Sequence, residues 1–161
     1  MSDLIVSDSS PIISFARAKK VHLVKNVCGG LIIPQEVYNE IVVKGEGKPG
    51  AEEIKNAKWV SLQKPKNRLE VEELKERLGP GESEAIVLAQ ELKAILLADE
   101  WSTIKEARGR GIEIISTHLI LIEAKKKGFI KSVKEELNEL IATGFRTTSE
   151  LIKKTLQKVG E

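Results

Sequence analysis

Short apolar runs alternate along this chain with longer segments in which apolar residues recur three and four positions apart. Residues 4–7, 31–33 and 95–98 are runs of the first kind, and a segment of the second kind follows each of them. This alternation is typical of strand–helix units that wind around a parallel sheet. We therefore expect an α/β fold with a central parallel sheet.

Turn and capping residues set the expected bounds of the elements. We expect strands over residues 4–7, 31–33, 59–62, 95–98 and 112–115. Ser9 or Ser10 should cap the first helix, which has Pro11 in its first turn. Further helices are expected over residues 21–27, 34–45, 51–57, 68–78, 82–92, 104–110, 119–127, 132–142 and 149–159.

A chain of 161 residues fits one domain, which at this size buries roughly 70% of its extended-chain surface. We expect a single domain over residues 1–161, with C-terminal helices at about 132–159 packed on it or extending it. The one cysteine, Cys28, cannot pair within the chain and suits a reducing compartment. No apolar run approaches the ~18 residues of a membrane span, so we expect a cytoplasmic protein with no membrane partner.

The charge balance is too even to indicate a partner. The chain has 26 Lys and Arg against 24 Asp and Glu, a net charge of +2, and many solvated surfaces share this balance. Lys125, Lys126 and Lys127 form a basic run, with Arg108 and Arg146 on other segments; such residues contact RNA phosphates only if they line the mouth of a site. Aromatic residues make up 4% of the chain, which argues against an extensive stacking platform for bases.

Four carboxylates stand where separate elements can bring them together. Asp8 and Asp99 directly follow expected strands, and Glu40 and Glu84 lie near the starts of helical segments. In open α/β sheets ligands collect outside the carboxyl ends of the strands, and clustered carboxylates repel one another unless a hard cation holds them. The pattern predicts an Mg²⁺ or Mn²⁺ site and hydrolysis of phosphodiesters. The alternative is that these are ordinary charged residues, with Asp8 and Glu84 acting only as helix caps.

Two further acids, close in sequence to these four, are alternative candidates for metal ligands. Glu82 lies two positions before Glu84, and residues two apart on a helix do not share a face. Because Glu84 directly precedes an apolar stripe, we expect its side chain to point inward toward the site and Glu82 to point elsewhere. Glu100 directly follows Asp99. Either Glu82 or Glu100 could still support the ligands or hold a second metal.

Three further residues each have two open interpretations. The hydroxyl of Ser9 could orient Asp8 or a water, or cap the first helix. Thr117 could contact the site from the end of the last strand, or cap the helix that follows. His118 could face the carboxylates and touch substrate, or serve packing. Neither His118 nor His22 has a second histidine or cysteine at metal-ligand spacing, so we expect no zinc site.

Four acidic segments follow one another along the chain: Asp8-Ser-Ser-Pro-Ile-Ile, Pro34-Gln-Glu-Val-Tyr-Asn-Glu40, Gly79-Pro-Gly-Glu-Ser-Glu84-Ala-Ile-Val-Leu-Ala and Leu96-Leu-Ala-Asp99-Glu. Together they resemble the ordered motifs of PIN domains, the nuclease fold of VapC-type toxins. The similarity continues to the end of the chain and is to a prokaryotic PIN-like subfamily. It implies a three-layer α/β/α sandwich around a central parallel sheet.

The resemblance also implies a metal-dependent endoribonuclease that cleaves single-stranded RNA with Mg²⁺ or Mn²⁺ as cofactor. Its catalytic and metal-binding residues would be Asp8, Glu40, Glu84 and Asp99, and its supporting residues Ser9, Glu82, Glu100 and Thr117. The family often has Asp at the third position, and Asp99-Glu100 is a shortened form of its fourth motif, so one metal or two stays open. The alternative is a PIN-like protein without catalysis that binds RNA or another protein.

The expected partners follow from the same resemblance. RNA is the expected substrate, and the commonest setting of the family is the toxin of a toxin–antitoxin pair, with a cognate antitoxin protein as partner. We also expect a homodimer, because the apolar faces of the early helices offer more area than one side of a small sheet covers. Those faces carry Ile12, Ile13, Phe15, Val37, Ile41 and Val42.

Overall fold

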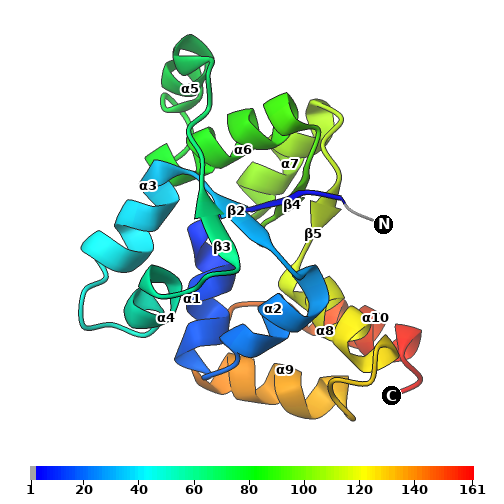
Figure 1. The fold of residues 1–161 in the computed structure, drawn as a ribbon. Helices are drawn as coiled ribbons and strands as arrows, with labels where there is room; N and C mark the ends of the chain where they lie inside the picture. The colour runs from blue at the N-terminus through cyan, green and yellow to red at the C-terminus, as the bar shows by residue number, and fades with distance from the viewer. Residues whose placement is uncertain (1–2) are drawn as a thin grey trace.

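A five-stranded parallel sheet forms the middle of the protein in the computed structural model, which describes residues 3–161 (Figure 1). The strands lie side by side in the order β3-β2-β1-β4-β5, and every pair is parallel. All five expected strands are therefore present, and β1 is the central one. Their bounds are β1 (Ile5–Ser7), β2 (Leu31–Ile33), β3 (Val60–Leu62), β4 (Ile95–Leu97) and β5 (Ile114–Ile115).

Each expected helix is present within a few residues of its predicted bounds. The segment that begins after Pro34 differs in one respect, because a short α-helix continues directly into a π-helical turn. The helices are α1 (Ser9–Arg17), α2 (Val21–Cys28), α3 (Gln35–Tyr38), the π-helix η1 (Asn39–Val43), α4 (Ala51–Lys55), α5 (Arg68–Leu74), α6 (Pro80–Leu92), α7 (Trp101–Gly109), α8 (Thr117–Lys126), α9 (Val133–Ala142) and α10 (Ser149–Lys158).

The two faces of the sheet are covered by different helices. In β4, Leu96 packs in one core with residues of α5, α6 and α7, whereas Leu97 packs in the other core with residues of α1, α2, α8 and α9. This alternation follows from the two-residue period of a strand, whose successive side chains point to opposite faces. Figure 1 shows α6 and α7 on one side of the sheet and α1, α2 and α9 on the other. The predicted three-layer α/β/α sandwich is confirmed.

The order of the strands reverses between β1 and β4. From β1 the chain builds outward to β2 and β3 on one side, and from β4 to β5 on the other. The backbone N–H of Asp8, directly after β1, donates a hydrogen bond of 3.0 Å to the carbonyl of Leu97, the last residue of β4. Open α/β sheets bind ligands at the carboxyl ends of the strands where the order reverses. Asp8 therefore lies at the position where a ligand is expected.

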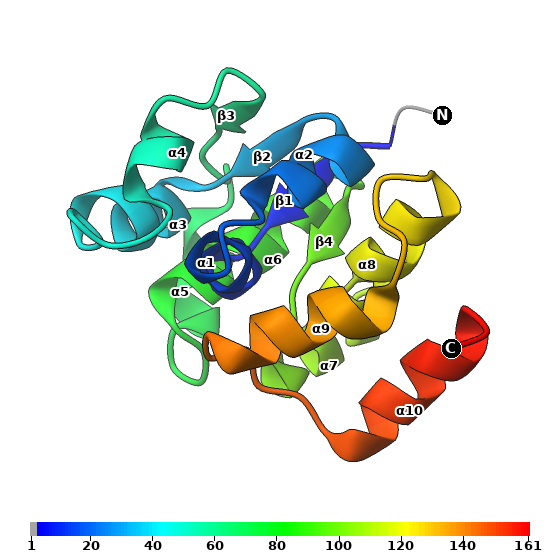
Figure 2. The same ribbon diagram turned by 90° about the horizontal axis from the view of Figure 1, so that it is seen from below.

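His118 attaches the last helix to the body of the protein. The hydroxyl of Thr155 donates to the carbonyl of Leu151 (2.7 Å), so the Nδ1–H of His118 must be the donor in its 2.7 Å contact with Thr155. In the neutral ring, which burial favours, Nε2 then accepts from the hydroxyl of Thr147 at 2.7 Å. The ring is buried, and burial lowers the pKa of His118. Of the two interpretations, the structure supports packing, here of α10 at the rim of the molecule (Figure 2).

The apolar residues from which we expected a homodimer are used inside the chain. Ile12, Phe15, Val37, Ile41 and Val42 are all buried in the core shared by α1, η1 and the sheet. Ile13 is partly buried against the same core. The reason given for self-association is therefore wrong, and the dimer itself stays a prediction. Within residues 3–161, no helix combines the length and the apolar character needed to cross a membrane.

The carboxylate of Glu161 ties the end of the chain to the start of α9. It accepts hydrogen bonds from Ser132 Oγ (2.9 Å) and from the backbone N–H groups of Val133 (2.8 Å) and Lys134 (3.0 Å), and it pairs with Lys125 Nζ (2.8 Å). The contact with Lys125, together with these donors, lowers the pKa of Glu161 to about 2 from 4.5. The last residue thus caps a helix that lies far from it in sequence.

We expect Glu161→Gln to lower the free energy of unfolding at pH 7 by about 1 kcal/mol, because a neutral amide interacts more weakly with Lys125 and the start of α9. A depressed carboxyl pKa contributes stability above about pH 4.5 that is lost as the pH falls toward 2. Urea unfolding between pH 2 and 7 should show the two proteins converging at the acid end. Glu46→Gln, the same change in an exposed loop, is the control; an equal loss in both variants would refute the cap.

Candidate metal centre

Asp8 is a buried carboxylate at the carboxyl end of the central strand. It caps α1, because one of its oxygens accepts the backbone N–H of Ser9 at 2.8 Å. The cap of this helix is thus Asp8, and the prediction that Ser9 or Ser10 caps it is wrong. Only 2% of Asp8 is exposed to solvent. Asp8 therefore does cap a helix, as the alternative to metal binding proposed, but the cap uses only one of its two carboxylate oxygens.

Burial is the main reason that the pKa of Asp8 rises from 3.8 to about 7. The hydrogen bond from the backbone of Ser9 opposes this rise, whereas the negative charges of Glu82, Glu40 and Glu100 add to it. These three acids come from α6, η1 and the residue before α7. Like charges around a desolvated carboxylate disfavour its ionised form. The structure therefore concentrates negative charge at this end of the sheet.

Glu40 reaches this region from the π-helical part of the segment that follows Pro34. It lies in the π-helical turn η1, a feature that often occurs at functional sites. Its carboxylate accepts a hydrogen bond of 2.5 Å from Ser9 Oγ, so the hydroxyl of Ser9 orients Glu40 rather than Asp8. The same carboxylate lies against Gly81 at the start of α6, where an added Cβ would come within 2.5 Å of Glu40 Oε1. Gly81 therefore leaves the room that Glu40 occupies.

Glu82 and Glu84 have exchanged the directions that we predicted. Glu82 is one of the acids that raise the pKa of Asp8, and it is held by Thr103 Oγ1 and by the backbone N–H of Gly79 (3.2 Å). Glu84 is buried, but its oxygens accept from the backbone N–H of Glu36 (2.9 Å) and from Arg68 Nη1 (2.5 Å). The prediction that Glu84 points toward the site and Glu82 away from it is wrong.

Asp99 lies at the end of β4 with both oxygens bound to one residue. It accepts from the backbone N–H of Thr117 at 2.8 Å and from Thr117 Oγ1 at 2.5 Å. Burial raises the pKa of Asp99, and the two bonds from Thr117 oppose the rise. Ser116 is the cap of α8, so Thr117 contacts Asp99 and does not cap its helix. Glu100 is exposed beside it.

Sequence reasoning missed three residues that determine how these acids are held. Thr103 fixes Glu82, Arg68 pairs with Glu84, and Gly81 makes space for Glu40. Gly81 had a usable signal, because a glycine in the first turn of a helix, directly before an acid, indicates a close approach of another group. Thr103 and Arg68 had none, since each belongs to a helix whose position relative to α6 depends on the tertiary fold.

The donors around Asp8 suit a hard divalent cation. Carboxylate oxygens are the ligands that Mg²⁺ and Mn²⁺ prefer, and a buried acid with a raised pKa among other acids gains from a positive charge. Among residues 3–161, no three acidic, histidine or cysteine side chains lie close enough together to hold a cation as they stand. Mg²⁺ commonly keeps several waters and binds one or two carboxylates. The residues therefore fit such an ion by chemistry, without forming a closed cage.

A cleft of about 920 Å³ opens next to these acids. Its lining includes Ser9 from α1, Asp99 and Glu100 from the end of β4, and Trp101 at the start of α7. Two arginines, Arg17 and Arg146, line it as well. The cleft thus brings acidic residues of the candidate centre together with cationic side chains that suit an anionic substrate.

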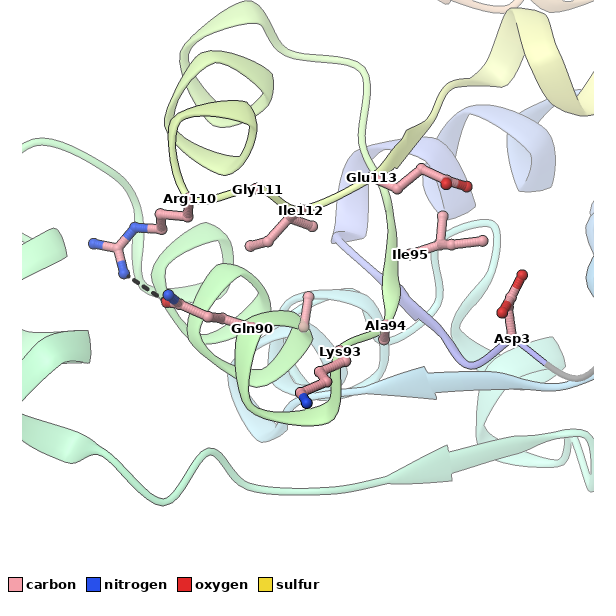
Figure 3. A pocket seen from close by; sticks show the side chains of 10 residues that line it. Asp3, Gln90, Lys93, Ala94, Ile95, Arg110, Gly111, Ile112 and Glu113 are labelled. Atoms are coloured by element: carbon pink, nitrogen blue, oxygen red, sulfur yellow. Dashed lines mark hydrogen bonds between the residues drawn. The ribbon is translucent and has the colours of Figure 1, made fainter.

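A smaller pocket of about 270 Å³ lies at the opposite edge of the sheet. It is lined by Asp3, Lys93 and Glu113, which precede the strands β1, β4 and β5 (Figure 3). Arg110 at its rim is engaged, because it donates to Gln90 (2.9 Å) and pairs with Glu70. None of the acids predicted for the site lines this pocket.

Comparisons with known proteins agree with the fold. The model of the family DUF3368, described as a PIN domain, matches residues 4–161. A PilT N-terminus domain protein from the hyperthermophilic archaeon Sulfolobus solfataricus P2 is similar in structure, with a TM-score of 0.51. The two chains are 20% identical, and the match covers 75% of this chain and 92% of the other. No curated protein matches the chain.

Without metal, we expect Asp8→Asn to stabilise the protein above neutral pH, because Asn keeps the helix cap and removes a buried charge. The folded-state pKa of Asp8, about 7, lies above its ordinary value of 3.8, so this group favours folding most below about pH 4 and loses that contribution as the pH rises through 7. The difference between these two pKa values corresponds to a loss of at most about 4 kcal/mol in the free energy of unfolding at pH 8.

Thermal unfolding in EDTA between pH 4 and 8 measures this effect. The melting temperature of Asp8→Asn should exceed that of the wild type at pH 8, and the two should approach each other at pH 4. Asp99→Asn is the comparison at the next strand: burial raises the pKa of Asp99 too, but two bonds from Thr117 oppose the rise, so this variant should gain less stability at pH 8 than Asp8→Asn. A variant Asp8→Asn that is less stable than the wild type at pH 8 would make Asp8 a structural cap only.

Proposed function

Because the chain belongs to the PIN-domain family, we propose that it is a metal-dependent endoribonuclease that cleaves single-stranded RNA. Proteins with this domain are generally nucleases. We assign the metal site to Asp8, Glu40 and Glu82, with Asp99 and Glu100 at its open side. This assignment replaces Glu84 by Glu82. The choice of Mg²⁺ or Mn²⁺, RNA as the substrate, the toxin role and the antitoxin partner stay predictions.

The observation that carries this proposal is the accumulation of acids around Asp8. Burial and three neighbouring carboxylates raise the pKa of Asp8 to about 7, so the site holds negative charge at a cost in stability. A protein that used Asp8 only as a cap would gain nothing from Glu40, Glu82 and Glu100 beside it. A cation bound here would offset the repulsion among the carboxylates, which gives the arrangement a function.

The side chains around the acids fix their positions for such chemistry. Ser9 holds Glu40, Thr103 holds Glu82, and Thr117 holds Asp99. A divalent cation bound by these carboxylates supplies positive charge to the phosphate and makes a water a stronger nucleophile. In the reaction the oxygen of a water bonds to phosphorus and the water gives up a proton, the bond from phosphorus to the leaving ribose oxygen breaks, and that oxygen takes up a proton. Arg17 and Arg146 place cationic charge in the cleft where phosphates would approach.

A second candidate is a PIN-domain protein that binds RNA or another protein without cleaving. Two observations favour it: both oxygens of Asp99 are occupied by Thr117, and within residues 3–161 the acids form no ready group of three. In that case the acids around Asp8 would be a remnant of a catalytic centre. Cleavage of RNA separates the two candidates.

A cleavage assay on pooled single-stranded RNA tests the proposal. With Mn²⁺ or Mg²⁺ the wild type should cut internal phosphodiester bonds, and EDTA should stop it. Asp8→Asn should lose activity about 100-fold or more, although it folds at least as well as the wild type without metal. RNA that stays intact with the wild type under all metal conditions, while the protein still binds it, would establish the second candidate instead.

Glu82→Gln and Glu84→Gln form a matched pair within the same assay. Glu82→Gln should lower cleavage roughly 10- to 100-fold, because one of the acids beside Asp8 is lost. Glu84→Gln should cleave at nearly the wild-type rate. Its free energy of unfolding should fall by about 2 kcal/mol, because the substitution breaks an ion pair with Arg68 in which the Glu84 carboxylate is buried. The reverse pattern would restore Glu84 to the metal site.

A further inference from the structure

Two clefts meet at Trp101. The first, described above, is lined by α1 and by the acids at the end of β4; we refer to it as the α1 cleft. The second, of about 710 Å³, runs between α7, α8 and α10 and is the α10 groove. Asp99, Trp101 and Arg146 line both. Trp101 therefore stands where a ligand would pass from one cleft to the other.

The side chain of Trp101 does not take part in the packing of either core. It is 65% exposed, and it belongs to neither of the two cores. A single exposed apolar residue needs no explanation by itself. The position of Trp101, next to Asp99 in the chain and at the junction of two clefts, gives its exposure a use. A flat indole face at such a point is suited to stack against another ring.

The α10 groove is cationic. Its lining includes Arg108, Arg146, Lys154 and Lys158, against Asp99 as its only acidic lining residue. Among the residues that the structure describes, none of these four basic side chains forms an ion pair. Unpaired cations along a groove attract an extended polyanion and hold it through its phosphates.

The α1 cleft contains an unused polar group as well. The hydroxyl of Ser10 is buried and has no hydrogen-bond partner within residues 3–161. Buried polar groups without a partner are rare in native proteins and cost stability. Ser10 lines the cleft together with Asp99 and Arg146, so this unpaired hydroxyl lies in the wall of the α1 cleft.

We propose that Trp101 stacks against one base of a single-stranded nucleic acid whose phosphates continue along the α10 groove. The inference rests on the proposed function, since the scissile phosphate would then lie in the α1 cleft beside the acids. A duplex keeps its bases stacked inside, so only a single strand offers a base to the indole. Trp101 is a specificity-determining residue in this account: it positions a base and requires that one be present.

An acidic peptide is the competing occupant of the same groove, because it would also meet the four cations. It would not need the indole face to stack, and it would not reach phosphate chemistry in the α1 cleft. The structure favours the nucleic acid because Trp101 lies where the cationic groove joins the α1 cleft, so that an indole face and cations that bind phosphates stand together. Binding by bases and binding by charge alone can be told apart directly.

The test measures the fluorescence of Trp101 during titration with oligonucleotides. The background is Asp8→Asn with Trp59→Phe, which stops cleavage and leaves Trp101 as the sole tryptophan, since the chain has two. The probes are a ten-residue oligoadenylate, an abasic ribose-phosphate strand of the same length, and a ten-residue oligoaspartate. Titrations are made without metal at low salt.

Oligoadenylate should quench Trp101 and bind more tightly than the abasic strand, and oligoaspartate should leave the emission unchanged. Trp101→Ala should weaken the binding of oligoadenylate roughly 5- to 100-fold and leave the affinity for the abasic strand unchanged. Binding to this variant is measured by the fluorescence anisotropy of a labelled strand. Trp101→Phe should restore most of the affinity. Leu69→Ala, an exposed apolar residue outside both clefts, is the control and should change nothing.

Equal affinity for the abasic strand and oligoadenylate, or equal affinity of Trp101→Ala and the wild type, would overturn the stacking role. The proposed nuclease would survive that result if the wild type still cleaves RNA with Mn²⁺. Tight binding of oligoaspartate with no binding of oligoadenylate would assign the groove to an acidic protein segment and also overturn the inference. Lys154→Ala should lower the salt dependence of oligoadenylate binding by about 0.7 in the log–log slope; an unchanged slope would remove the α10 groove from the strand's path.

Discussion

The burial of the Asp8 carboxylate among other carboxylates is the constraint on which the rest of this structure depends. A parallel sheet whose order reverses between β1 and β4 leaves an opening at the ends of these strands. Asp8 fills that opening, caps α1 and is almost wholly withdrawn from water. Glu40, Glu82 and Glu100 then add charge of the same sign. A fold selected for stability alone would place a hydroxyl or an amide at this position.

The surrounding structure keeps the acids in place in spite of their repulsion. Each of three carboxylates is held by a hydroxyl from another element: Ser9 for Glu40, Thr103 for Glu82 and Thr117 for Asp99. Hydroxyl donors stabilise a carboxylate without neutralising its charge, so the site stays negative. Glu84 differs, because Arg68 neutralises it and the start of α3 binds its other oxygen. Glu84 ties α3 and α5 to α6, which is a structural role.

The sequence predicted those parts of the site that depend on strands. Asp8 and Asp99 follow strands of one parallel sheet, so their common edge could be inferred from the pattern alone. Glu82 and Glu84 could not be told apart, because the inward face of α6 at its first turn depends on where α3 and α5 pack. Glu84 is buried, but its partner Arg68 lies on another helix, which the pattern could not indicate. The low aromatic content spoke against base stacking, yet one tryptophan at the right place is enough to stack one base.

The central claim is that the acids around Asp8 form a divalent-cation site in which Glu82, and not Glu84, takes part. A crystal structure grown with Mn²⁺, with anomalous scattering measured to locate the ion, tests it most directly. We expect an anomalous peak about 2.1 Å from an oxygen of Asp8, with Glu82 and Glu40 turned toward it and Glu84 still bound to Arg68. A map with no peak at Asp8, or with a peak held by Glu84, would contradict it.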